Sequence, residues 1–226
     1  MRRWFDPSWG DNEIRYNNYM DMHAERMKWA PLSIAKIKVT DNLITDEDAQ
    51  LFMDYIDNNL DKFVTDASRA IPNRHILRFG YDEVWEDSKP DMAIISDIKD
   101  LVNKYRDVMV NKIKELYGDE EIYLTSFHMG KQGPGAKVLR HLDGAVDVNP
   151  QFKYSGIVYL NTVEDGGDLG FPNLEFSVKP LKNQFITFPA YDGIIFDHEV
   201  NKIGSDRYCL PCWFTTDKNL EVKFPD

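Results

Sequence analysis

The sequence of 226 residues contains only two cysteines, Cys209 and Cys212. Their C-x-x-C spacing falls in an apolar run with the character of a β-strand, where residues three apart point to opposite faces. We therefore expect two small core residues rather than a redox pair or half of a zinc site. So few cysteines also fit a reducing compartment.

Long hydrophobic runs are missing as well. The amino-terminal residues Met-Arg-Arg-Trp-Phe-Asp contain no apolar segment of the kind found in signal peptides. No run reaches the roughly 20 apolar residues that a membrane-spanning helix needs. We therefore expect a soluble, cytoplasmic protein without a membrane partner.

Positive charge is scarce, because 27 Lys and Arg face 38 Asp and Glu and give a formal net charge of −11. Nucleic-acid partners require stripes of Lys and Arg that neutralise phosphates, and no such stripe is visible in the sequence. The most basic stretch contains Arg69, Arg74, His75 and Arg78, and we expect it to be a solvated loop. The composition therefore argues against a nucleic-acid partner.

Hydrophobic residues make up 42% of the chain, which is enough for one sizeable core. Residues 1–30 are aromatic, charged and irregular, and we expect an amino-terminal arm there. Residues 31–218 are predicted to be one domain, with helical support from 31–120 and a barrel core from 121–218. Residues 219–226 are predicted to be a carboxy-terminal tail.

Two segments show the periodicity of amphipathic helices. Residues 46–62 place apolar side chains at helical spacing after Thr45 and Asp48, a pair that resembles a capping box. A second apolar stripe runs from Ile94 to Leu116, and Gly118 is expected to end that helix. Both stripes are expected to face the core.

From Glu121 onward the period changes to that of β-strands, with Gly, Pro, Asp and Asn between the runs. The predicted strands cover residues 122–129, 137–142, 154–160, 169–171, 174–178, 184–188, 194–200 and 208–215. Two earlier runs, 34–40 and 76–81, are also predicted to be strands. Many short strands after two helices indicate a mostly β fold with supporting helices, either a β-sandwich or a jelly roll.

Three residues in this β-rich half, His141, Asp143 and His198, form a metal-binding pattern and are called the triad below. His141 and Asp143 stand two residues apart, so on a strand they point the same way, and His198 follows 57 residues after His141. Two imidazoles and one carboxylate hold non-haem Fe(II) and leave coordination positions open. Arg207, nine residues after His198, adds a planar cation that suits a carboxylate cosubstrate.

The triad and Arg207, together with several runs around them, resemble the 2-oxoglutarate/Fe(II)-dependent dioxygenases, and most of all their prolyl-4-hydroxylase branch. The runs that carry the likeness are Tyr159-Leu160-Asn161, Gly166-Gly167-Asp168-Leu169-Gly170-Phe171-Pro172, His198-Glu199-Val200 and Trp213-Phe214. They stand in the family's order and span roughly residues 123–216. The resemblance implies a double-stranded β-helix (jelly roll) that uses Fe(II), 2-oxoglutarate and O2.

The resemblance also implies a role for each matching residue. The triad would hold the iron, and Arg207 would pair with the C5 carboxylate of 2-oxoglutarate. Tyr159 would hydrogen-bond the same end of that cosubstrate, and His128 is the counterpart of a tyrosine that the family often places near it. The implied reaction hydroxylates a C–H bond, most of all on a prolyl residue of a peptide or protein, and releases succinate and CO2.

Two other functions stay open at this point. The same chemistry on a free amino acid or another small molecule would use the same iron site, and residues 63–90 and 130–136 would shape either a groove or a pocket. A non-enzymatic, cupin-like metal-binding module would be expected to lack a ligand or the arginine, whereas all four residues are present. A nucleobase-repair oxygenase is disfavoured by the acidic charge.

Overall fold

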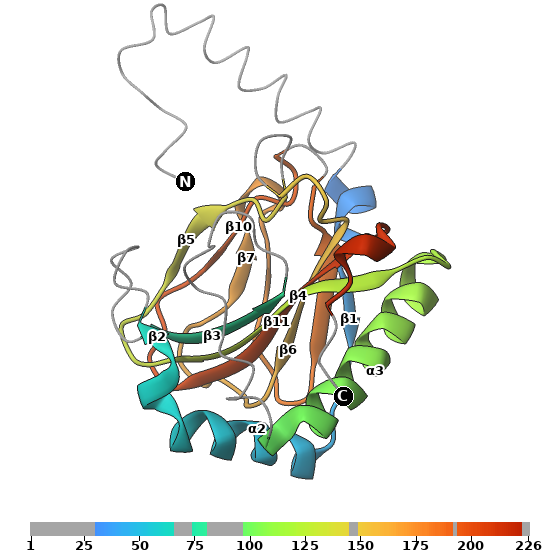
Figure 1. Ribbon diagram of the computed structural model, residues 1–226. Helices are drawn as coiled ribbons and strands as arrows, with labels where there is room; N and C mark the ends of the chain where they lie inside the picture. Colours follow the sequence, from blue (N-terminus) through green and yellow to red (C-terminus); the bar gives the residue numbers. More distant parts are fainter. Residues whose placement is uncertain (1–29, 66–73, 81–96, 145–148, 192–193, 223–226) are drawn as a thin grey trace, which may run out of the picture. The chain divides into compact units, whose positions relative to one another are not determined.

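The computed structural model describes residues 30–65, 74–80, 97–144, 149–191 and 194–222 (Figure 1). The chain divides into two compact units, residues 1–36 and residues 37–226. In the described part of the first unit, residues 30–34 form a helical turn in which Ala35 N donates to Pro31 O at 3.1 Å. Residues 1–29 of the predicted arm, Arg69 and Ile94 lie outside the described residues. Arg74 and His75, which we expected in a solvated loop, instead lie half-buried in the strand Arg74–Gly80.

The predicted strand over residues 34–40 is wrong in its first half. Only Lys38–Thr40 (β1) is extended, and it pairs with β9. Proline is well suited to the first turn of a helix, because its fixed φ fits and its missing N–H is not needed there. Pro31 therefore favours the helical turn that residues 30–34 adopt, and a short alternating run could not reveal this.

Both predicted helices are confirmed. Helix α2 covers Asp46–Asn58 and is capped by Thr45, whose side chain accepts from Asp48 N at 3.1 Å. Helix α3 covers Lys99–Tyr117 and ends at Gly118, which has a φ of +75°. Apolar side chains of both helices belong to one core cluster, which also contains residues of the larger sheet.

The strands form two antiparallel sheets, of seven strands in the order β1-β9-β6-β11-β4-β3-β2 and of four in the order β5-β10-β7-β8 (Figure 1). Their bounds are β2 Val64–Thr65, β3 Arg74–Gly80, β4 Tyr123–Gln132, β5 Val138–His141, β6 Tyr154–Tyr159, β7 Leu169–Phe171, β8 Phe176–Val178, β9 Phe185–Pro189, β10 His198–Val200 and β11 Arg207–Thr215. Each of the eight strands predicted after Glu121 is present. The predicted jelly roll with supporting helices is confirmed.

Side chains alternate along the long strand β11. Tyr208, Leu210, Cys212 and Phe214 belong to the core cluster shared with the helices. Arg207 and Cys209 point the other way, and an Arg207 N–H contacts the Cys209 sulfur at 3.2 Å. Both cysteines are buried and free, as predicted for two small core residues. The larger sheet thus presents one face to α2 and α3 and the other to the interior of the barrel.

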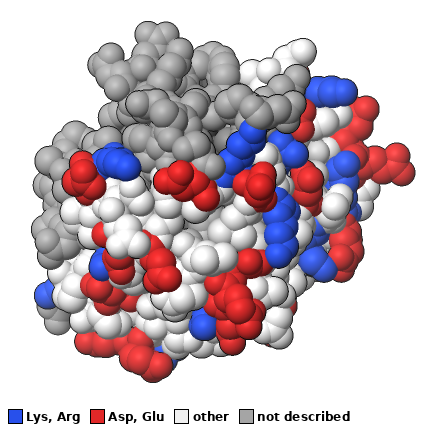
Figure 2. Space-filling view, turned by 60° about the horizontal axis from the view of Figure 1, so that its bottom comes forward, with Lys and Arg blue, Asp and Glu red and all other residues white. Residues whose placement is uncertain are grey.

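The side of the molecule that carries α2 is acidic. Several groups of Asp and Glu side chains lie on this face, with Lys and Arg interspersed among them (Figure 2). Such a surface repels polyanions, in keeping with the net charge of −11. None of the helices in the described part of the chain combines the length and apolar character that crossing a lipid bilayer requires.

Asp48 joins the start of α2 to α3. Its carboxylate accepts from Tyr105 Oη and from Lys104 Nζ, both at 2.6 Å. Burial raises the pKa of Asp48, but the hydrogen bonds from Lys104 and Tyr105 outweigh burial and leave this pKa below 3.8. The resulting stabilisation is present above pH 3.8 and is lost as the pH falls through the lower pKa of the folded state.

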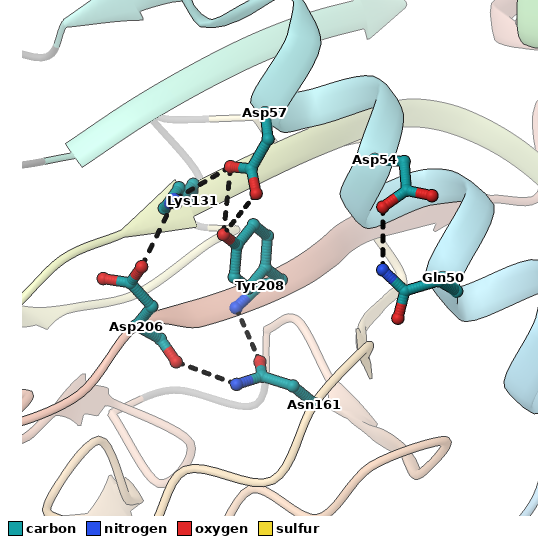
Figure 3. A network of polar contacts seen from close by, with 7 residues as sticks. All are labelled: Gln50, Asp54, Asp57, Lys131, Asn161, Asp206 and Tyr208. Carbon is teal, nitrogen blue, oxygen red and sulfur yellow. Dashed lines mark hydrogen bonds and ion pairs between the residues drawn. The ribbon is translucent and has the colours of Figure 1, made fainter.

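We expect Asp48→Asn to lower the free energy of unfolding by about 1 kcal/mol at pH 7 and by progressively less below pH 3.8. Urea denaturation of both proteins between pH 7 and pH 3 measures the difference. Asp54→Asn is the control, because Asp54 accepts only from Gln50 of the same helix among the contacts drawn in Figure 3. A difference in the free energy of unfolding between wild type and Asp48→Asn that stays constant with pH would contradict this interpretation.

The Gly166-Gly167 turn lies beside the start of β11. Both residues have positive φ, +68° and +73°, as expected for a tight turn between strands. A Cβ on Gly166 would lie 2.0 Å from the backbone oxygen of Lys202, whereas Gly135, with a φ of +89°, has nothing within 4 Å of such a Cβ. Gly135 therefore measures the cost of positive φ alone, and Gly166 adds a clash with the backbone.

We expect Gly166→Ala to lower the free energy of unfolding by about 3 kcal/mol or more, and Gly135→Ala by about 1–2 kcal/mol. Urea midpoints compared at equal m values give both numbers. Equal losses in the two variants would show that the backbone around Lys202 moves away from the added methyl group at little cost.

Candidate metal centre

The three residues of the triad come together at one end of the smaller sheet. His141 ends β5, Asp143 follows two residues later, and His198 begins β10, where it pairs directly with His141. The two imidazole centroids are 4.4 Å apart, and one ligand atom from each of the three residues lies within 4.8 Å of the others. A bulge between β5 and β10 stands next to this pair, as bulges often do where a side chain must be aimed.

Backbone carbonyls fix which ring nitrogen faces the metal position. His141 Nδ1 lies 2.8 Å from Leu139 O, and His198 Nδ1 lies 3.0 Å from Phe196 O. A carbonyl only accepts, so each Nδ1 carries the proton and each Nε2 keeps its lone pair. The two Nε2 atoms lie 3.3 and 3.6 Å from the carboxylate of Asp143. The donor set is therefore preorganised by its outer partners.

The environment sets the ionisation that a metal requires. Burial raises the pKa of Asp143, but His198 and His141 outweigh burial, so this pKa lies well below its usual range. Burial also lowers the pKa of His198, which favours the neutral ring. A carboxylate and neutral imidazoles are the forms in which these side chains bind metal ions. The residues present thus fit the two-histidine, one-carboxylate set of non-haem iron sites.

Aromatic side chains wall one side of the triad. Phe188 packs edge-on against His198 with ring centroids 4.8 Å apart, and Phe171 lies 6.1 Å from the same ring. Both phenylalanines are fully buried. They keep water from that side and restrict the motion of the His198 ring.

A second pair of side chains, which the sequence analysis did not single out, ties the two metal-binding strands together. Arg140 and Asp197 each precede a histidine of the triad, and Arg140 Nε donates to the Asp197 carboxylate. The other end of the guanidinium donates to Asn173 Oδ1 at 2.7 Å. In the sequence, the only signal is that residues of opposite charge stand directly before the two histidines. The pairing of β5 with β10 is what brings these two residues into contact.

Arg207, the first residue of β11, is 2% exposed and points into the barrel. Its N–H groups donate to Gln132 Oε1, to Tyr159 Oη at 3.3 Å and to Cys209 Sγ at 3.2 Å, while Nε has no hydrogen-bond partner. Among the residues that the structure describes, no carboxylate forms an ion pair with it. Burying an uncompensated charge is costly, so this guanidinium is suited to an anion that the chain itself does not supply.

Tyr159 lies beside Arg207, as the predicted cosubstrate role requires. The guanidinium carbon stands 5.0 Å from the centroid of the Tyr159 ring, and the ring is fully buried. Burial raises the pKa of Tyr159 even though Arg207 acts to lower it, so the phenol is neutral. Because Arg207 donates to Oη, the hydroxyl proton is left to donate to a further acceptor.

His128 is placed inside the barrel on β4, where it packs edge-on against Trp213 with centroids 4.6 Å apart. Trp213 stacks on Phe152 at 5.7 Å, and its indole N–H is buried without a hydrogen-bond partner. The structure thus associates His128 with an aromatic group on β11. Its assignment as a cosubstrate residue stays a prediction.

Comparison with known proteins decides the class of this fold. Residues 125–215 match the family described as the 2OG-Fe(II) oxygenase superfamily. This segment is a 2OG-Fe(II) oxygenase domain. It contains the complete triad and Arg207, so Fe(II) and 2-oxoglutarate are the metal and cosubstrate of this class of enzyme. Among curated proteins, no sequence matches the chain.

Solved structures resemble the oxygenase domain and the helices that support it. A viral collagen prolyl hydroxylase from Paramecium bursaria Chlorella virus-1, in complex with 2-oxoglutarate, is 18% identical over 81% of this chain and 97% of its own, with a TM-score of 0.57. A Pseudomonas putida prolyl-4-hydroxylase is 19% identical over 80% and 92%, with a TM-score of 0.54. A Trichoplax adhaerens prolyl hydroxylase, in complex with a peptide fragment of the oxygen degradation domain of hypoxia inducible factor, is 16% identical over 91% and 94%, with a TM-score of 0.57. At these identities the likeness shows the fold.

Proposed function

We propose that this oxygenase hydroxylates a prolyl residue in a peptide or protein, with iron held by the triad and 2-oxoglutarate held by Arg207 and Tyr159. The observation that carries the cosubstrate assignment is the buried guanidinium of Arg207. Its neighbours on the protein are neutral groups, and its Nε is left without a partner. A dicarboxylate would supply the missing negative charge.

The chain's own groups have distinct tasks in this reaction. Iron and 2-oxoglutarate, when bound, supply the activation of O2, the transfer of one oxygen atom to a C–H bond and the release of succinate and CO2. The triad would hold the metal through two imidazole nitrogens and one carboxylate oxygen. Arg207 grips the far carboxylate through its planar fork, and Tyr159 donates its hydroxyl proton to the same group. Phe171 and Phe188 exclude water beside His198.

The larger sheet links these two halves of the site. Ser155 contributes to lowering the pKa of Asp143, so it lies close to that carboxylate. Tyr159 stands four residues further along β6 and therefore on the same face, roughly 13 Å away at about 3.3 Å per residue. The cosubstrate would extend along this face of β6, between the metal and the Arg207 fork.

The prolyl substrate is supported by the structural neighbours. The viral and Pseudomonas proteins are prolyl hydroxylases by name, and the Trichoplax enzyme was solved with a peptide fragment bound. These neighbours are 16–19% identical to this chain, and a screen of peptides against free L-proline tests the substrate class directly.

The test begins with an anaerobic visible spectrum of the purified protein, titrated with Fe(II) and then with 2-oxoglutarate. A weak charge-transfer band that needs both additions and is lost in His141→Ala would support the cosubstrate assignment. Bound iron without such a band would instead favour a cupin-like metal-binding module.

Substrate screening follows with proline-containing peptides and free L-proline under Fe(II), 2-oxoglutarate and O2. We expect succinate release to rise with a peptide, and mass spectrometry to find one added oxygen atom on its proline. Hydroxylation of free L-proline with unmodified peptides would replace the peptide assignment by a small-molecule one.

A further inference from the structure

Asn161 continues the pairing of β6 with β11 by means of its side chain. Leu160 N donates to Tyr208 O at 3.0 Å, which is a backbone bond just beyond the end of β6. Asn161 Oδ1 then accepts from Tyr208 N–H at 2.8 Å, and Asn161 Nδ2 donates to Asp206 O at 2.8 Å (Figure 3). These are the two peptide groups on either side of Arg207.

The geometry of the backbone gives this arrangement its importance. Each peptide group is planar, so rotation about φ and ψ of Arg207 is the soft motion between its two flanking groups. Asn161 binds the carbonyl oxygen before Arg207 and the N–H after it, and both bonds end on one rigid amide. Such a clamp restricts both rotations and thereby fixes the direction of the Cα–Cβ bond of Arg207.

The flanking residues are also held from the helix side of the sheet. Tyr208 Oη donates to both carboxylate oxygens of Asp57 on α2, at 3.0 and 2.9 Å. Lys131 pairs with Asp57 at 2.8 Å and with Asp206 at 3.2 Å (Figure 3). These contacts hold the side chains of Asp206 and Tyr208. The Asn161 amide instead holds the backbone on both sides of Arg207, whose side chain points away from α2 into the barrel.

We infer that Asn161 is a positioning residue for Arg207 and so sets the affinity for the C5 carboxylate of 2-oxoglutarate. The inference rests on the proposed function. A binding group must be held to within roughly 0.5 Å, and a displacement of about 1 Å can cost about 100-fold. The neutral side chains around the guanidinium form weaker bonds than a carboxylate would, so its aim depends on the backbone.

The test compares Asn161→Ala with two other variants. In Asn161→Ala we expect the dissociation constant of 2-oxoglutarate on the anaerobic Fe(II) protein to rise at least about 10-fold, with Fe(II) affinity unchanged and kcat at saturating cosubstrate within about twofold. Asn161→Asp keeps the acceptor for Tyr208 N–H and loses the donor, so an intermediate rise is expected. Asn59→Ala is the matched control, because Asn59 Nδ2 donates to the backbone oxygen of Tyr55 at 2.9 Å on α2.

Amide hydrogen exchange at Tyr208 in the protein without 2-oxoglutarate tests the clamp itself. We expect faster exchange in Asn161→Ala and wild-type exchange in Asn59→Ala. Unchanged exchange, an unchanged dissociation constant, or an equal rise in the Asn59 control would overturn the role of Asn161. Failure of the wild-type protein to bind 2-oxoglutarate would instead overturn the proposed function, so the two failures are distinguishable.

Discussion

Asp143→Ala is expected to lower Fe(II)-dependent turnover at least about 1000-fold. Loss of an outer-sphere partner of a metal ligand already costs about 10- to 100-fold, and this change removes one of three ligands outright. The two imidazoles that remain have centroids 4.4 Å apart, and two imidazoles hold iron poorly when the carboxylate is gone. Iron content after anaerobic loading and initial rates of succinate release measure the two effects.

The fold is expected to survive this substitution, because the change removes a small charged group from one end of the barrel. Glu199→Ala provides the control. Glu199 follows His198 on β10 and therefore points to the other face of that strand, opposite Gly170 on β7. We expect the Glu199 variant to retain iron and turnover. Wild-type turnover in a folded Asp143→Ala protein would place the metal elsewhere.

Local patterns in the sequence predicted most of this fold for a physical reason. The strands after residue 121 are short and bounded by Gly, Pro, Asp or Asn, so propensity, period and turn chemistry agree. In residues 34–37 the local signals disagree. The short alternating pattern predicts a strand, whereas Pro31, three positions before this run, favours a helical turn. The pairing of β5 with β10, which assembles the site, follows no local pattern.

The triad was predictable because metal binding restricts both residue type and spacing. Arg207 was singled out by its place nine residues after His198 and by its planar charge, and the structure buries it inside the barrel, while its cosubstrate role stays a prediction. Two sets of contacts could not be predicted, the Arg140–Asp197 pair and the Asn161 clamp, because Arg140 and Asp197 are 57 residues apart and Asn161 and Asp206 are 45 apart. Both sets consist of ordinary polar residues, and their roles follow only from the strands that bring them together.

Replacing Arg207 by methionine, which has similar length and no charge, is expected to raise the dissociation constant of 2-oxoglutarate by about 30- to 5000-fold. This range corresponds to the roughly 2–5 kcal/mol that loss of one partner from a buried, hydrogen-bonded ion pair costs. Arg207→Lys keeps the charge and loses the fork, so a smaller rise is expected. Fe(II) affinity should stay at the wild-type value in both variants, since the triad is untouched. The anaerobic titration measures both constants.

Stability measurements separate a binding role for Arg207 from a structural one. Without 2-oxoglutarate, the buried guanidinium has no carboxylate partner among the described residues, so Arg207→Met is expected to leave the free energy of unfolding unchanged or raised. At about 100 times the wild-type dissociation constant, 2-oxoglutarate should stabilise the Fe(II)-loaded wild-type protein by about 2.7 kcal/mol and the variant by less than about 1 kcal/mol. A large loss of stability in the ligand-free variant would make the arginine part of the fold's own packing. If 2-oxoglutarate did not raise the free energy of unfolding of the wild-type protein, the cosubstrate would not bind in this pocket.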